Sequence, residues 1–145
     1  MDFINRLIHA LTQMHPLHPM LVHFPIALSG AAALFILLAL WKKDAGFEKF
    51  AFANLVLTVF GTIAAGLTGM YDNSLNYGGD APNSGVKMIL ALTLFVLTTV
   101  TVIVRWKNPT VFQSGGKALY VSAYLLSFTL ALVLAFLGGV ILYGF

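Results

Sequence analysis

Long apolar stretches alternate with short polar ones along this chain. Four stretches of about 20 residues contain almost no charged side chain, and they cover approximately residues 21–41, 50–70, 87–105 and 119–143. Since a helix rises about 1.5 Å per residue, each stretch can cross a hydrocarbon core about 30 Å thick. Strands of a membrane barrel would be shorter and would alternate polar with apolar positions. The pattern therefore predicts four transmembrane helices.

The polar connections between these stretches are short, so consecutive helices should lie side by side and antiparallel. We expect a single membrane domain over residues 1–145, of the all-α class, forming an integral membrane four-helix bundle. Small side chains let membrane helices approach closely. Such residues recur at Ser29 to Ala33 in the first span, at Gly61, Ala64, Ala65 and Gly69 in the second, and at Ala131, Ala135, Gly138 and Gly139 in the fourth.

Residues 1–20 precede the first span and are more polar than the spans. Within residues 2–14 the apolar side chains fall on one helix face, which predicts a short amphipathic helix lying in the membrane interface. The next residues, His15-Pro16-Leu17-His18-Pro19, should break that helix, because the residue before a proline disfavours the helical conformation. A span that starts near Leu21 has Pro25 in its first turn or so, where a missing N–H does least harm.

The composition supports a lipid environment and excludes several kinds of site. Of the 145 residues, 59% are hydrophobic and 9% are charged, whereas soluble domains carry about 25% charged residues. The chain has no cysteine, which excludes disulfides, iron–sulfur clusters and thiolate-bound metals. A net charge of +3 is too small to indicate a nucleic-acid partner.

Lys and Arg are distributed unequally between the two ends of the predicted bundle. Six of them lie at the first and third connections, and two, Arg6 and Lys87, lie at the other end. Cytoplasmic loops carry the excess of Lys and Arg in membrane proteins. We therefore expect both termini and the loop over residues 71–86 to lie on the outer side.

All four histidines fall at that outer end, and they are the main candidates for chemistry. His15, His18 and His23 can ligate haem iron, copper or zinc through neutral imidazole. His18 and His23 are five positions apart, so they would converge only if the chain bends at Pro19. Met70 and Met88 are candidates for a further ligand, since a thioether suits Cu(I). The alternative is that the histidines bond to backbone carbonyls and that the methionines fill packing gaps.

Other kinds of activity are not indicated. No nucleophile lies beside a base, and no carboxylates are paired, so we do not expect an enzyme. The spans carry no ionisable residues at depth, which argues against a pump or transporter.

Three segments resemble a known family. The segment His18-Pro19-Met20-Leu21-Val22-His23-Phe24-Pro25-Ile26-Ala27-Leu28 resembles the opening of the first span in the DUF2231 family of bacterial membrane proteins. Residues 66–72 and the Gly138-Gly139 pair followed by Tyr143 are similar to the ends of that family's second and fourth spans, although less specifically. Where members often carry a histidine at the third span this chain has Lys87, and where an acidic residue often follows the glycine pair it has Val140.

From the resemblance and the residues together we expect a location and two alternative functions. The location is the bacterial cytoplasmic (inner) membrane, with both termini on the periplasmic side. Related domains occur joined to electron-transfer modules, which implies an association with electron transfer and a b-type haem or copper site using His18 and His23. Lys87 in place of a histidine puts a haem with two histidine ligands in doubt. The alternative is an accessory subunit without a cofactor, which contacts lipid and other membrane protein subunits of a respiratory or photosynthetic complex.

Overall fold

Helices account for the regular structure in the part of the chain that the computed structural model describes, residues 2–9 and 17–143. They are α1 (Asp2–His9), α2 (Leu17–Lys42), α3 (Ala45–Tyr77), α4 (Ser84–Lys107), the short 3-10 helix η2 (Val111–Gln113) and α5 (Lys117–Tyr143). No strand is found among these residues, so the all-α fold class is confirmed. α1 covers the first part of the expected amphipathic helix, and the rest of that helix lies outside the described residues.

Four of these helices, α2 to α5, are long and apolar enough to cross a membrane. Each span expected from the sequence lies within one of them. α3 is longer than its expected span: its 33 residues extend about 50 Å, against a hydrocarbon core of about 30 Å. Its last turns, which carry Asp72, Asn73 and Asn76, therefore continue beyond the apolar part of the helix.

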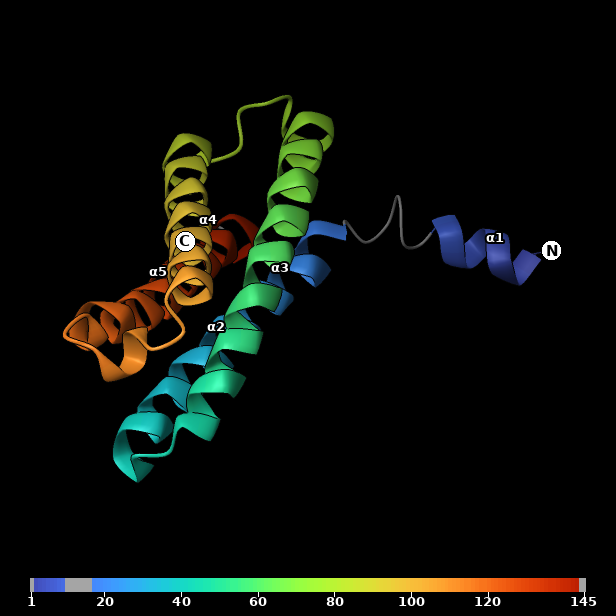
Figure 1. Ribbon diagram of the computed structural model, residues 1–145. Coiled ribbons are helices and arrows are strands. Elements are labelled where there is room, and N and C mark those ends of the chain that lie inside the picture. Colours follow the sequence, from blue (N-terminus) through green and yellow to red (C-terminus); the bar gives the residue numbers. More distant parts are fainter. Residues whose placement is uncertain (1, 10–16, 144–145) are drawn as a thin grey trace.

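The four long helices pack in a ring. α2 and α3 lie against each other along much of their length, α4 packs on α3, and α5 packs on both α2 and α4 (Figure 1). The core cluster joins α2, α3, α5 and η2, and it includes Ile36, Leu55 and Tyr124, each no more than 1% exposed. Large apolar side chains on the outer surface, such as Leu57, Phe60 and Phe136, are more than half exposed, as expected where a helix faces lipid.

The bundle has two chemically different ends. The Lys-rich end consists of the α2–α3 connection, the α4–α5 connection and the helix termini beside them. The histidine end consists of the start of α2 and the α3–α4 connection, where α3 stops at Gly78 with a left-handed φ of 59°.

The path of α2 differs from the expected one. The helix begins at Leu17, so Pro19 lies in its first turn, where no backbone N–H is needed for the helix. The expected bend at Pro19 is therefore wrong. Pro25 lies eight residues after Leu17, inside the helix rather than in its first turn.

The expected close contacts of small residues are confirmed in two places. A Cβ on Gly61 would lie 3.2 Å from Pro25, and a Cβ on Gly30 would lie 3.0 Å from the ring of Phe128. The absence of a side chain at Gly61 thus allows Pro25 of α2 to pack closely against α3. Gly138 and Gly139 have nothing within 4 Å among the described residues, so the expected contact there is not found.

Candidate functional site

His18 is held against α3 by a hydrogen bond to the backbone. Its Nδ1 lies 3.0 Å from the carbonyl oxygen of Ala65. Because a carbonyl oxygen can only accept, Nδ1 carries the proton; when the ring is neutral, its lone pair lies on Nε2. The hydroxyl of Thr68 lies 3.5 Å from the same Nδ1 but donates to the Ala64 carbonyl at 2.8 Å. We find no hydrogen-bond partner for Nε2 among the described residues.

Gly69 makes room for this imidazole. A Cβ at position 69 would lie 2.8 Å from Cε1 of His18 and 3.3 Å from its Nε2, so any larger residue would displace the ring. Ala65, Gly69 and Asp72 follow each other at spacings of four and three residues, which places them on one face of α3. The His18 ring therefore lies on a stripe of α3 that leads to a carboxylate.

Charged groups from two other helices act on His18. The Asp72 carboxylate of α3 interacts electrostatically with both His18 and Lys87, and Lys87 of α4 also acts on His18. The Asp72 carboxylate accepts a hydrogen bond from the side-chain amide of Asn76. Lys87 is partly buried, as is a lysine whose aliphatic stem lies along an apolar surface. The histidine end thus gathers an imidazole, a carboxylate and an ammonium group.

His23 also forms a hydrogen bond to a backbone carbonyl, but its side chain points in a different direction from that of His18. Its Nδ1 lies 2.6 Å from the carbonyl oxygen of Pro19, one turn earlier in the same helix, and its side chain is exposed. Because α2 is continuous here, five residues separate the two imidazoles by about 140° around the helix axis. The structure therefore does not bring His18 and His23 together.

The other predicted ligands are Met70, Met88 and His15. Met70 and Met88 are 63% and 50% exposed, respectively. His15 lies outside the described residues. Within the part of the chain that the structure describes, no three His, Cys, Asp or Glu residues are grouped so that they could hold a metal ion.

These positions decide which kind of haem or metal site fits the chain. A site that uses both His18 and His23 on one ion does not fit, because their imidazoles point apart. A site that uses Nε2 of His18 as a single ligand is compatible with the hydrogen bond on Nδ1. Histidine ligands commonly donate their other ring N–H to a backbone carbonyl, which fixes the tautomer and the ring orientation. Ala65 provides that carbonyl.

A second polar cluster, at the Lys-rich end, was not anticipated from the sequence. Glu48 is 3% exposed and accepts two hydrogen bonds from Arg105, from Nε at 2.6 Å and from Nη2 at 3.0 Å. The hydroxyl of Tyr120 donates to the same carboxylate at 2.8 Å. It also lies 2.7 Å from the hydroxyl of Tyr124. The cluster joins α3, α4 and α5 at the ends of the expected spans, so it does not contradict the expectation of spans without ionisable residues at depth.

The cluster of Glu48, Arg105, Tyr120 and Tyr124, here called the Glu48 cluster, forms its hydrogen bonds among its own members. Both carboxylate oxygens of Glu48 are used, and the guanidinium of Arg105 also lies 5.4 Å from the centre of the Phe52 ring. Asp44 starts α3 by accepting a hydrogen bond from the Gly46 N–H at 2.7 Å, which places Glu48 in the first turn facing inward. We interpret this cluster as a structural connection among three helices.

Comparison with known proteins supports the resemblance noted above. The family model described as a predicted membrane protein (DUF2231) matches residues 14–145. The chain belongs to the DUF2231 family. The matched region contains all of the four long helices and His18 of the histidine end. No curated protein and no solved structure matches the chain.

Proposed function

We propose that this DUF2231 protein is a membrane subunit associated with electron transfer, in which His18 offers one ligand to a b-type haem or a copper ion at the histidine end. The observation that carries the proposal is the hydrogen bond from Nδ1 of His18 to the Ala65 carbonyl. It leaves a lone pair on Nε2, which is the nitrogen that a metal would need.

The surroundings of His18 favour a fixed ligand. The ring is limited on one side by Gly69 and held by the Ala65 carbonyl, so little side-chain freedom remains to be lost on binding. The Asp72 carboxylate acts electrostatically on His18 and would partly balance the positive charge of a bound metal. A bound haem or copper ion would supply one-electron redox chemistry.

The remaining ligands would come from another subunit. His23 points away from His18, and the described residues offer no second imidazole beside it. This geometry favours an accessory role, because the residues that the structure describes would complete only part of the coordination. In such a role the chain itself would catalyse no reaction.

The orientation in the membrane is part of the proposal. The Lys-rich end carries six Lys and Arg residues in the two connections and adjoining helix termini. The positive-inside tendency then places this end in the cytoplasm of a bacterial inner membrane. His18 and both termini would lie on the periplasmic side.

The test is an absorption spectrum with metal analysis of the protein purified in mild detergent, together with the subunits that accompany it. The variant His18→Asn keeps an amide that can donate to the Ala65 carbonyl but removes the imidazole Nε2. We expect a Soret band or stoichiometric copper in the wild type and its loss in His18→Asn. The matched control His23→Asn should retain it.

Two results would count against the ligand role. The first is a colourless, metal-free preparation from cells supplied with haem and copper. The second is an equal loss of cofactor in His18→Asn and His23→Asn, which would show that Nε2 of His18 has no special part.

The second candidate function is an accessory subunit without a cofactor. It is favoured by the position of His18, whose bond to Ala65 already connects α2 to α3 and whose ring fills the space above Gly69. In that case the protein would co-purify with partner subunits but remain colourless. Isolation as a lone, monodisperse monomer in mild detergent would contradict this candidate.

A further inference from the structure

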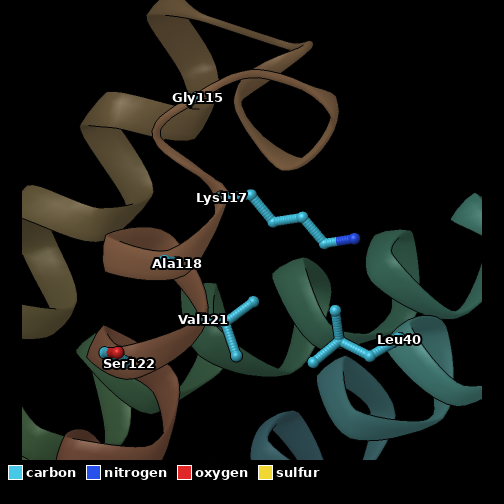
Figure 2. A pocket seen from close by; sticks show the side chains of 6 residues that line it. All are labelled: Leu40, Gly115, Lys117, Ala118, Val121 and Ser122. Atoms are coloured by element: carbon cyan, nitrogen blue, oxygen red, sulfur yellow. The ribbon is translucent and has the colours of Figure 1, made fainter.

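A surface cavity of about 540 Å³ lies at the Lys-rich end, between the end of α2 and the start of α5. Figure 2 shows its lining, which consists of Leu40, Gly115, Lys117, Ala118, Val121 and Ser122. The cavity is wide open to the surface, so it could hold a ligand along the protein but would not enclose it. No group of the Glu48 cluster or of the histidine end lines it.

Lys117 is the charged residue of this cavity. Its side chain extends from the first turn of α5 over the cavity, on the side where Leu40 lies (Figure 2). Nζ lies 4.8 Å from the centre of the Phe112 ring, a contact that leaves the ammonium N–H groups available for an acceptor. Among the described residues the one ion pair joins Arg105 to Glu48, so Lys117 has no carboxylate partner there.

The rest of the lining is mostly apolar and belongs to transmembrane helices. Leu40 comes from the last turns of α2, and Ala118 and Val121 come from the first turns of α5. Both helices continue from here towards the centre of the bundle. A molecule that places an anionic group at Lys117 would therefore lay an apolar part along α2 and α5.

The charge of the surrounding surface favours an anion. Lys42, Lys43, Lys49 and Lys107 lie at the same end and are exposed. The two acidic residues nearby are engaged, Asp44 as the cap of α3 and Glu48 in its pair with Arg105. Basic residues at the membrane surface attract anionic lipids, each by roughly a fivefold increase in affinity.

We propose that this cavity binds an anionic phospholipid, with the lipid phosphate at the Lys117 ammonium and the first part of an acyl chain against Leu40 and Val121. A lipid fits better than a soluble anion, because the apolar wall belongs to helices that face the bilayer. The bound lipid would fill the space between α2 and α5 and hold these helix ends together.

The binding can be measured by thermal unfolding of the detergent-solubilised protein with added phosphatidylglycerol, phosphatidylcholine or inorganic phosphate. We expect stabilisation by phosphatidylglycerol but not by the other two. Lys117→Gln keeps most of the side-chain stem and should weaken the phosphatidylglycerol effect by roughly fivefold in apparent affinity. Ala118→Leu should weaken it too, because it fills the cavity without changing the charge.

Lys49→Gln is the matched control, since it removes an exposed positive charge from the same end outside the cavity. It should weaken the phosphatidylglycerol effect less than Lys117→Gln does, because its charge acts only through the attraction of the whole surface. Equal weakening in Lys49→Gln and Lys117→Gln would show attraction to the whole surface and would overturn the site. Stabilisation by phosphatidylcholine or by inorganic phosphate to the same extent as by phosphatidylglycerol would overturn the choice of ligand.

Discussion

Glu48 and Arg105 are joined by two hydrogen bonds, of 2.6 and 3.0 Å, although 57 positions separate them in the sequence. The pair connects the start of α3 to the end of α4, and Tyr120 brings α5 into the same cluster at 2.8 Å from the carboxylate. Both charged side chains are largely buried, at 4% exposed for Glu48 and 15% for Arg105. Each therefore depends on the other to offset the loss of hydration.

Removing one member of this pair should destabilise the bundle strongly. Glu48→Ala leaves the Arg105 guanidinium without its acceptor in a region of low dielectric constant, at a cost of about 3–5 kcal/mol. Thermal unfolding in detergent, followed by circular dichroism, measures the change. The double variant Glu48→Leu/Arg105→Met should recover most of the loss, because apolar groups of similar volume need no partner. A single variant as stable as the wild type would show that the pair is not coupled.

Gly69 and Gly66 provide a matched comparison on α3. A Cβ at position 69 would lie 2.8 Å from His18, whereas a Cβ at position 66 would meet nothing within 4 Å. Gly69→Ala should destabilise the protein by about 1–3 kcal/mol, because the imidazole is held by Ala65 and has to be displaced. Gly66→Ala should be neutral or stabilising by up to about 1 kcal/mol.

The cause of the Gly69 effect can be isolated with a double-mutant cycle. In a His18→Ala background the imidazole is gone, so adding Gly69→Ala should cost little. A penalty that persists in that background would place its origin in some other contact of α3 rather than in the His18 ring.

The orientation can be tested with single cysteines, since the chain has none of its own. The two substitutions are Asp80→Cys and Gln113→Cys. Asp80 lies in the α3–α4 connection at the histidine end, and Gln113 lies in η2 at the Lys-rich end. Both native residues are exposed. A thiol reagent that does not cross membranes should label position 80 in intact cells and position 113 only after lysis. The reverse pattern would place the Lys-rich end outside.

The long helices could be predicted from the sequence because lipid imposes a simple requirement on the backbone. Nearly every residue of a span is apolar, so length and composition suffice. The start of α2 could not be predicted as well, because Pro19 is compatible both with a loop and with a first helical turn. In the structure these residues are helical, and the continuous helix points the side chains of His18 and His23 in different directions.

The polar contacts between helices depend on which helix faces pack together, and that packing is harder to predict from the sequence than the helices themselves. Glu48 lies at helical spacing with the buried residues Ala51, Leu55 and Thr58, and that phase was the available signal that it points inward. For its partner Arg105 the sequence indicates only a place at the basic end of the bundle, since nothing local relates positions 48 and 105. His18 was predicted as a site residue, but its bond to Ala65 required knowledge of how α2 packs on α3.

The most direct test of the central claim is the protonation of the two ring nitrogens of His18. Nitrogen-15 NMR of histidine-labelled protein without a cofactor, at a pH of about 8 where imidazoles are ordinarily neutral, distinguishes the two tautomers. With His18→Asn used to assign the signals, we expect Nδ1 of His18 to carry the proton and Nε2 to be unprotonated. A proton on Nε2 with a bare Nδ1 would contradict both the bond to Ala65 and the proposed role of His18 as a ligand.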